Sequence, residues 1–308
     1  MFDKEILQYK VGALLYMPAF QSNIIPKITG NKLPHLTSAA FCLEDSIQDA
    51  SLDDAEKSLQ FILHELENIP NLPLIFVRIR SPRHLEIFHE TIGLRSKILT
   101  GYILPKFDMS NAGAYIKLAK EINLPVMPTL ETNRVASLLT RRNELLSLKQ
   151  SLDEIKNIVL NIRVGVNDFC NLYWLRRNVN QTIYDIGVVR DILIDILNVF
   201  AKDYVVAGSV WNFFGGSWAE GLQRELELDK VNGFIGKSAI HPAQLPIIFN
   251  SMKVNHADFD DANILLNWKS TTHGVMKSSD GSRMNEVKCH LNWARRIKIL
   301  SELYGVIE

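Results

Sequence analysis

The chain has 308 residues, of which 47% are hydrophobic and 22% are charged, a composition ordinary for a globular protein with a large core. Basic and acidic residues number 34 each, so no net positive charge draws the chain to nucleic acid or to an anionic membrane. Its three cysteines form no disulfide or metal-ligand pattern, the first residues do not resemble a secretory signal, and no stretch has the length of a membrane span. We therefore expect a cytoplasmic protein with neither a nucleic-acid nor a membrane partner.

Short apolar runs alternate along the chain with longer segments of helical periodicity. Apolar runs without strict alternation are typical of strands buried on both faces of a parallel sheet. The expected strands are residues 13–18, 39–44, 73–79, 101–106, 124–130, 157–166, 204–208 and 232–237. The clearest helical patterns are residues 52–69, 110–122, 184–202, 217–230 and 241–252. This alternation predicts an α/β fold, a (β/α)₈ TIM barrel, with an open doubly wound sheet as the alternative.

The barrel pattern ends near residue 252, which divides the chain into two expected parts. We assign residues 1–252 to a TIM-barrel catalytic domain and residues 253–308 to a C-terminal helical appendage. In the appendage, two helical patterns flank a polar, glycine-containing loop at residues 270–285. We interpret this part as a lid or an oligomerisation segment.

Charged residues follow several of the expected strands. Because TIM-barrel active sites form at the carboxyl ends of the strands, these residues are candidates for a shared site. They are Glu44, Asp45, Arg78, Arg80, Glu131 and Asp168. Mg²⁺ binds a few carboxylate oxygens and keeps water positions open for substrate, so it would compensate Glu131 and Asp168 at adjacent strand ends. The alternative is that Glu131 pairs with Arg134 or Arg163 and that Asp168 caps the segment after it.

Three other features have both a functional and a structural interpretation. Arg78 can hold a carboxylate or phosphate through its planar fork, or form an ion pair with Glu44 or Asp45. Lys106 can act as a Schiff-base lysine, although a salt-bridged lysine is the more common case at a strand end. The glycine-bracketed loop at residues 233–242 has a shape that can bind an anion through backbone N–H groups.

Seven short motifs occur in one order along most of the chain. They are ALLYMPA (13–19), FCLEDSIQDASLDDAEKSL (41–59), FVRIR (76–80), LPKF (104–107), PTLET (128–132), VGVNDF (164–169) and GFIGKSAIHPAQL (233–245). In this order they resemble the citrate lyase β-subunit and malyl-CoA lyase family, magnesium-dependent carbon–carbon lyases within a wider aldolase superfamily. The resemblance implies a TIM barrel, a homo-oligomer (trimer or hexamer), and Glu131 and Asp168 as ligands of Mg²⁺.

The resemblance also implies a reaction. The enzyme would cleave or condense a 2-keto-acid or acyl-CoA substrate through a metal-stabilised enolate. Arg78 is expected to hold the substrate carboxylate and to act in catalysis, with Glu44 and Asp45 orienting Arg78 or the water molecules on the metal. The further residues assigned to substrate binding are Arg80, Met17 and Pro18.

Two departures from the family's pattern leave other functions open. The opening loop, PAFQ at residues 18–21, lacks the glycine and the basic residue that lie near the CoA phosphates in relatives. The related hydroxy-acid aldolases carry a histidine where this chain has Asp45, which favours the lyase-like branch. The alternatives are a CoA-independent 2-keto-acid aldolase and, in another class, a non-catalytic ligand-binding barrel.

A last motif lies in the appendage. GSRMNEV at residues 281–287 is similar to the G-x-M-(I/V)-D segment of relatives, whose aspartate reaches the active site of a neighbouring subunit. Glu286 stands in the place of that acid and is assigned a catalytic role. The alternative is that Glu286 is a first-turn residue of the final helix, where its charge complements the helix dipole.

Overall fold

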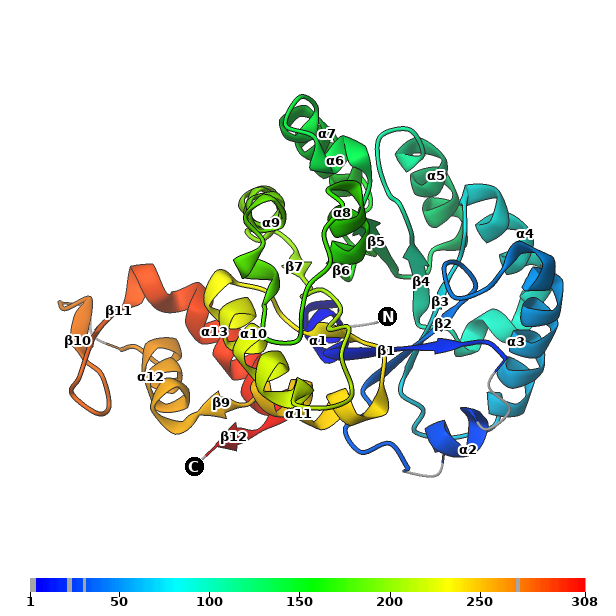
Figure 1. The fold of residues 1–308 in the computed structure, drawn as a ribbon. Coiled ribbons are helices and arrows are strands. Elements are labelled where there is room, and N and C mark those ends of the chain that lie inside the picture. Colours follow the sequence, from blue (N-terminus) through cyan, green and yellow to red (C-terminus); the bar gives the residue numbers. More distant parts are fainter. Residues whose placement is uncertain (1–3, 21–23, 30–31, 270–271, 308) are drawn as a thin grey trace. The chain divides into compact units, whose positions relative to one another are not determined.

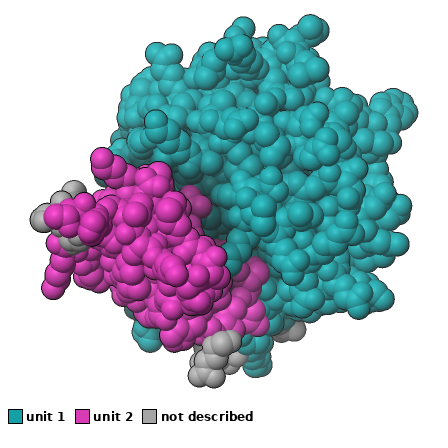
Figure 2. Space-filling model, turned by 90° about the vertical axis from the view of Figure 1, so that its left-hand side faces the viewer, with its two compact units in different colours: residues 1–248 teal, residues 249–308 magenta. Residues whose placement is uncertain are grey.

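The structure is a computed structural model that describes residues 4–20, 24–29, 32–269 and 272–307. The first three residues of the chain, Gln21 of the opening loop, and residues 270 and 271 of the expected appendage loop lie outside the described residues. The chain divides into two compact units, residues 1–248 and residues 249–308, which Figure 2 colours separately.

Unit 1 is built on an eight-stranded parallel sheet in the order β7-β6-β5-β4-β3-β2-β1-β8 (Figure 1). The strands are β1 (Ala13–Pro18), β2 (Ser38–Cys42), β3 (Leu74–Arg78), β4 (Gly101–Leu104), β5 (Val126–Leu130), β6 (Asn161–Val164), β7 (Val205–Val206) and β8 (Lys237–Ala239). A bridge between Gly208 and Lys237 joins the two ends of this order, so the sheet closes on itself. The predicted TIM barrel is therefore confirmed, and the open sheet is wrong.

Helices follow the strands and surround the barrel (Figure 1). They are α1 (Lys4–Lys10), α2 (Ile24–Thr29), α3 (Leu52–Leu66), α4 (Pro82–Ile92), α5 (Ala112–Ile122), α6 (Asn133–Ala136), α7 (Arg141–Asp153), α8 (Val166–Leu172), α9 (Gly187–Phe200), α10 (Trp218–Asn232) and α11 (Leu245–Ser251). Short 3₁₀ turns are η1 (Asp49–Ser51), η2 (Gly93–Ile98), η3 (Ile183–Asp185) and η4 (Pro242–Gln244). All five helical patterns of unit 1 named from the sequence therefore coincide with helices, within a few residues at their ends.

The eighth strand begins later than expected. The run expected at residues 232–237 starts with the end of α10, which Gly233 terminates in a left-handed conformation with φ 99°. Gly236 follows with φ 73°, and a Cβ there would come within 2.4 Å of the Gly12 carbonyl oxygen. Because both glycines have positive φ angles, the start of the apolar run is not extended, and the strand itself is Lys237–Ala239.

Alternation along the strands produces an apolar layer inside the barrel. Because successive side chains point to opposite faces, every second residue of each strand faces the interior. One buried cluster contains Leu14, Phe76, Ile103 and Met127 from the strands, together with Leu7 and other side chains. This apolar layer supports a second inward layer, two residues further along several strands, and that layer is polar.

Unit 2 is a small helical unit with short strands. Its elements are β9 (Val254–Asn255), α12 (His256–Leu266), β10 (Val275–Lys277), β11 (Met284–Glu286), α13 (Val287–Tyr304) and β12 (Val306–Ile307). The two long helices pack on each other, and the fully buried Asp261 accepts hydrogen bonds from the Arg283 side chain and the Ser279 backbone. Across the described part of the chain, the helices all lack the combination of length and apolarity that crossing a membrane requires.

Candidate active site

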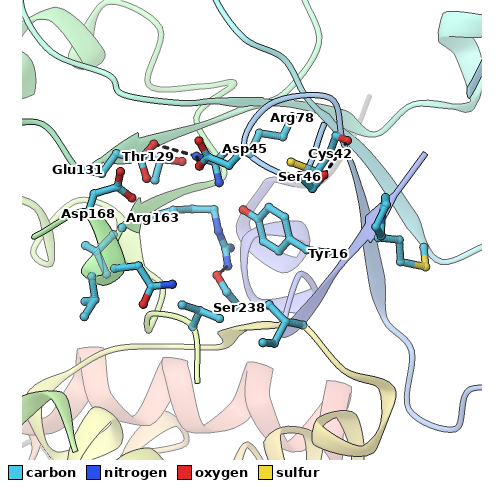
Figure 3. A pocket seen from close by; sticks show the side chains of 18 residues that line it. Tyr16, Cys42, Asp45, Ser46, Arg78, Thr129, Glu131, Arg163, Asp168 and Ser238 are labelled. Atoms are coloured by element: carbon cyan, nitrogen blue, oxygen red, sulfur yellow. Dashed lines mark hydrogen bonds and ion pairs between the residues drawn. The ribbon is translucent and has the colours of Figure 1, made fainter. Parts of the chain in front are cut away.

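A pocket of about 350 Å³ opens at the carboxyl ends of the barrel strands (Figure 3). Its lining includes six residues assigned to the site from the sequence: Met17, Pro18, Asp45, Arg78, Glu131 and Asp168. They lie in β1, in the loop after β2, in β3, directly after β5 and in α8. Barrel closure therefore brings together side chains that are far apart in the sequence.

Arg78 lies at the centre of the acidic side of this pocket. Its Nη2 is 2.8 Å from Glu44 Oε2, 3.1 Å from Asp45 Oδ2 and 3.0 Å from Glu131 Oε1. Although burial lowers the pKa of Arg78, the charges of Glu131 and other neighbours raise it overall. The ion-pair interpretation of Arg78 is therefore confirmed, while its buried Nε has no hydrogen-bond partner among the described residues.

Glu131 follows β5 directly and is 4% exposed. Its Oε1 accepts hydrogen bonds from Arg78 Nη2 and from the Lys106 backbone N–H, at 3.0 and 2.8 Å. Burial raises the pKa of this carboxyl to about 7; Arg78 lowers the pKa, and the nearby charge of Asp168 raises it. The alternative pairings are wrong, because Arg134 binds Glu144 and the Arg163 guanidinium binds other groups.

Asp168 lies in the first turn of α8, which begins two residues after β6 ends. Its carboxylate and that of Glu131 point toward the same space in Figure 3. Burial raises the pKa of Asp168, and the charge of Asp45 raises it further. Two adjacent carboxyls with raised pKa values are a place where a cation would stabilise the ionised forms.

The chemistry of this pair fits Mg²⁺. The ion prefers carboxylate oxygens and usually keeps several water molecules, so it needs only one or two protein carboxylates. The described residues contain no group of three or more His, Cys, Asp or Glu side chains arranged to hold a metal. Glu131 and Asp168 therefore suit a metal that remains partly hydrated, and they do not suit a fully enclosed metal site.

Gly165, between β6 and α8, leaves room for the Glu131 side chain. A Cβ at this position would be 2.1 Å from Glu131 Oε2 and 2.4 Å from Glu131 Cβ. Such distances are far below van der Waals contact, so a larger residue would displace the carboxylate. Steric contact thus explains why the VGVNDF motif has a glycine at this position: it makes room for the acid of the PTLET motif.

Glu44 and Asp45 share their second partner, Lys106. Lys106 Nζ is 2.6 Å from Glu44 Oε1 and 3.2 Å from Asp45 Oδ1, which confirms the salt-bridged interpretation of this lysine. Burial raises the pKa of Glu44. Burial also opposes ionisation of Asp45, but the hydrogen bond with Glu44 and the charges of Arg78 and Lys106 hold its pKa below the usual value. Asp45 is therefore the carboxylate that stays ionised at the pocket edge.

Arg80 is not among the residues that line the pocket. Its Nε donates to the Leu43 carbonyl at 2.6 Å, its Nη2 donates to the Ile47 carbonyl, and its Nη1 pairs with Asp49. These contacts of the guanidinium stabilise the loop that carries Glu44 and Asp45. The structure does not bring it together with the other assigned substrate-binding residues, because the backbone of this loop holds its donors.

Two features of the 233–245 motif also have structural roles. Lys237 is fully buried and pairs with Glu225 at 2.9 Å and Asp229 at 2.6 Å. His241 begins η4, and its Nδ1 accepts a hydrogen bond from the Ala243 backbone at 3.2 Å. The lysine of this loop therefore belongs to a buried ion network with two carboxylates, and it is not among the residues that line the pocket.

Glu286 belongs to unit 2. It is the last residue of β11 and immediately precedes α13, and its backbone N–H donates to His290 Nδ1 at 2.9 Å. Its side chain makes no capping hydrogen bond to the helix. Glu286 therefore lies one residue before the first turn of the helix in which it was expected. Its catalytic role stays a prediction.

Among the polar pocket residues absent from the set assigned from the sequence are Tyr16, Thr129, Arg163 and Ser238. Each lies on a barrel strand, at a position that faces the interior. For Arg163 the signal is alternation: it lies between Ile162 and Val164, which both belong to the main hydrophobic cluster. Because burying an unpaired charge is costly, an arginine at an inward position of a barrel strand predicts a partner inside the barrel.

Comparison with known proteins identifies the family. The sequence profile of the C–C bond lyases of the TIM-barrel fold matches residues 5–306. The chain belongs to this family. It is thus a carbon–carbon lyase, as the motifs indicated. By sequence, no protein of curated function matches it significantly.

Solved structures similar to this C–C bond lyase include citrate lyase β-subunit proteins. CitE from Mycobacterium tuberculosis, in complex with magnesium, acetoacetate and coenzyme A, has a TM-score of 0.64 and 18% identity, covering 95% of this chain and 99% of its own. RipC from Yersinia pestis has a TM-score of 0.57 and 16% identity, covering 79% and 95%. The M. tuberculosis citrate lyase β subunit with oxaloacetate and magnesium has a TM-score of 0.56 and 18% identity, covering 79% and 98%. At these identities the likeness supports the barrel fold.

Proposed function

We propose that this lyase binds Mg²⁺ through Glu131 and Asp168 and uses it to cleave, or in reverse to form, a carbon–carbon bond of a 2-keto acid. The observation that carries the proposal is that two carboxyls, the buried Glu131 and the half-buried Asp168, line one pocket with Arg78 and both have raised pKa values. Several similar solved structures hold magnesium together with pyruvate, oxaloacetate or acetoacetate, which supports this choice of metal and ligand.

Arg78 holds the substrate carboxylate in this proposal. Its Nη2 is occupied by three acids, but its side chain is 12% exposed and lines the pocket, so the open part of the guanidinium is available to a ligand carboxylate. When bound, Mg²⁺ polarises the keto group and offsets negative charge that develops on it. The fixed charge of Arg78 stabilises the same developing charge.

Cleavage requires a group that accepts a proton. In a 4-hydroxy-2-keto acid, the hydroxyl loses its proton as the C3–C4 bond breaks, so the hydroxyl-bearing carbon leaves as a carbonyl compound. The remaining enolate takes up a proton at C3 to give the 2-keto acid. Asp45 suits the first transfer because its side chain is 52% exposed, lines the pocket and has a lowered pKa. Lys106 and Glu44 position it through the contacts described above.

The second unit has a place in the same proposal. We assign residues 253–308 to a lid or oligomerisation segment, with Glu286 acting in a neighbouring subunit of a homo-oligomer. The support is the similarity of residues 281–287 to the family's acidic segment. Cytoplasmic location and the absence of nucleic-acid partners likewise stay predictions from the composition.

Calorimetric titration with Mg²⁺ and pyruvate tests the function. The parent should bind Mg²⁺, and pyruvate should bind only when Mg²⁺ is present. Glu131→Gln and Asp168→Asn should each weaken Mg²⁺ binding at least tenfold, because each removes a charged ligand. Arg78→Lys should bind Mg²⁺ normally and pyruvate more weakly, because lysine lacks the planar fork. Unchanged Mg²⁺ affinity in both carboxylate variants would refute the proposal.

A further inference from the structure

Tyr16 is a pocket residue that the proposed chemistry does not use. It lies in β1, is half-buried and lines the same pocket as Glu131 and Asp168. In Figure 3 its hydroxyl points toward the middle of the pocket and lies beside the Arg163 guanidinium. A phenol in this place can both donate and accept a proton, so it can act on a molecule that occupies the pocket.

Two guanidinium groups lie close to this phenol. The Arg78 guanidinium carbon is 6.0 Å from the centre of the Tyr16 ring, and Arg163 lies beside the hydroxyl. Burial lowers the pKa of both arginines, and interaction with Tyr16 raises it, in the case of Arg78 after a larger effect of Glu131. Because such an interaction is mutual, the two cations stabilise negative charge on the Tyr16 oxygen.

Arg163 differs from the other buried cations of the described residues. Arg141, Arg177 and Lys237 are also buried, and each is paired with a carboxylate. Among the described residues no carboxylate pairs with Arg163, although its guanidinium remains charged at any pH the protein experiences. Burying an unpaired cation is costly, and a negative charge that forms beside it offsets that cost. An ionised Tyr16 is such a charge.

We propose that Tyr16 is a catalytic residue that donates the proton taken up by the enolate at C3. This rests on the proposed function, which supplies the enolate. The O–H bond of Tyr16 breaks as a C–H bond forms at C3, so the enolate becomes the 2-keto acid and the phenol becomes a phenolate. Arg78 and Arg163 stabilise the phenolate until a proton from solvent restores the phenol. The proton that Asp45 took from the substrate hydroxyl returns to solvent, so the enzyme ends the cycle unchanged.

The reverse direction follows from the same step. To form a carbon–carbon bond, the Tyr16 phenolate removes a proton from C3 of the 2-keto acid, and the resulting enolate attacks the carbonyl compound. The alternative is that Asp45 transfers both protons, that of the hydroxyl and that of C3. The two assignments differ in which variant loses proton transfer at C3.

Hydrogen exchange at C3 of pyruvate tests the assignment, because pyruvate has no hydroxyl to deprotonate. In D₂O each removal and return of a C3 proton replaces C–H by C–D, and proton NMR follows the loss of the methyl signal. The Mg²⁺-loaded parent at saturating pyruvate should exchange faster than Mg²⁺ without protein. Tyr16→Phe keeps the ring and loses the hydroxyl, so its exchange rate should fall at least about 100-fold, while calorimetry shows unchanged pyruvate binding.

Tyr173→Phe is the matched control. The Tyr173 hydroxyl donates to the Ala136 carbonyl at 3.2 Å, and Tyr173 is not among the residues that line the pocket. Removing this hydroxyl changes the same atom of the same residue type outside the pocket. Tyr173→Phe should therefore exchange pyruvate at the rate of the parent.

Each outcome separates the two proposals. Normal exchange by Tyr16→Phe overturns the assignment and leaves the proposed function standing, and loss of exchange in Asp45→Asn then assigns the C3 proton to Asp45. Pyruvate that binds the Mg²⁺-loaded parent without exchange also overturns the assignment alone. If pyruvate does not bind the Mg²⁺-loaded parent, the proposed function fails and the assignment fails with it.

A second measurement decides if Tyr16→Phe does not fold. A fluorinated tyrosine in place of Tyr16 keeps the hydroxyl and makes the phenol more acidic. The pH at which exchange reaches half its maximum should then be lower than in the parent, a shift that a purely structural role of the ring does not produce. An unchanged pH profile overturns the assignment.

Discussion

Glu131 is a deeply buried acid whose negative charge is only partly balanced by neighbouring positive charge. Burial raises its pKa, Arg78 lowers it in part, and the charges of Asp168 and Glu44 raise it further, so the folded protein binds the proton more tightly than the unfolded chain does. Ionising this group without a metal therefore opposes folding. Residues of this kind are a stability cost at neutral pH, which a bound cation offsets.

We predict a pH-dependent stability that Glu131 controls. The pKa of Glu131 rises from 4.5 to about 7 on folding, so its destabilising effect is absent below pH 4.5, grows as the pH rises, and is complete above about pH 7. The loss for this one group is at most about 3 kcal/mol. Urea unfolding of the metal-free protein at pH 5 and pH 8 measures it.

The control for this prediction is Glu131→Gln, which has no charge to bury. It should lose less stability than the parent between pH 5 and pH 8, and Mg²⁺ at pH 8 should stabilise the parent more than the variant. Identical pH profiles for the two proteins would show that Glu131 does not have the raised pKa.

At the scale of elements, the site depends on how the turn between β6 and α8 meets the end of β5. Gly165 starts that turn, and its missing side chain leaves the space that Glu131 occupies. The same turn places Asp168 in the first turn of α8. The position of both proposed metal ligands therefore depends on a contact between two loops.

We predict that Gly165→Ala lowers Mg²⁺ affinity at least tenfold, because the new Cβ would displace the Glu131 carboxylate. Calorimetric titration with Mg²⁺ measures the change. Gly113→Ala in α5 is the matched control, since a Cβ there meets no atom within 4 Å. That control should bind Mg²⁺ normally and gain up to about 1 kcal/mol of stability from better helix propensity. Normal Mg²⁺ binding by Gly165→Ala would contradict the packing argument.

The sequence predicted the barrel because its strands are strongly apolar and separated by helical patterns. The least accurate boundary was that of the eighth strand, where glycine conformations at Gly233 and Gly236 decide the start of the strand. The start of helix α4 has a local signal in the sequence, with Pro82 in its first turn and Ser81 as a cap that accepts from the His84 N–H. Glycine conformations and helix capping, more than hydrophobicity, decide where these two elements begin.

The site was predicted less completely than the fold. Acids at strand ends are visible in the sequence, and Asp45, Glu131 and Asp168 line one pocket. Arg80 was assigned by its place in the FVRIR strand, but its guanidinium turns to backbone carbonyls that no sequence pattern reveals. The sequence presents Arg163 only as a possible partner for Glu131, because the register of the closed barrel decides which face of β6 points inward.

At the scale of the whole molecule, the proposed function divides one site between two chains. Glu286 belongs to residues 249–308, and the proposed metal ligands belong to residues 1–248. If the family's acidic segment serves the same purpose here, a complete site needs residues from two chains. Such an arrangement makes activity a property of the assembly.

We predict that two inactive variants complement each other. Glu286→Ala lacks the proposed acid and Asp168→Asn lacks a proposed metal ligand, so a mixed oligomer contains some sites with neither change. After joint unfolding and reassembly, turnover of the substrate should reappear, and each variant reassembled alone should stay inactive. Full turnover by Glu286→Ala alone would show that this acid has no catalytic part.

Strand β1 pairs with β2 on one side and with β8 on the other, where Ala13 meets Lys237. During synthesis the second partner is made only after nearly all of the barrel, a delay on the order of 10 to 50 s at ordinary elongation rates. Throughout that interval the β8-facing edge of β1 lacks its native partner. Unpaired strand edges promote association between chains. The nascent chain is therefore at its most vulnerable just before the barrel closes, and a chaperone that shields β1 should raise the yield of folded protein.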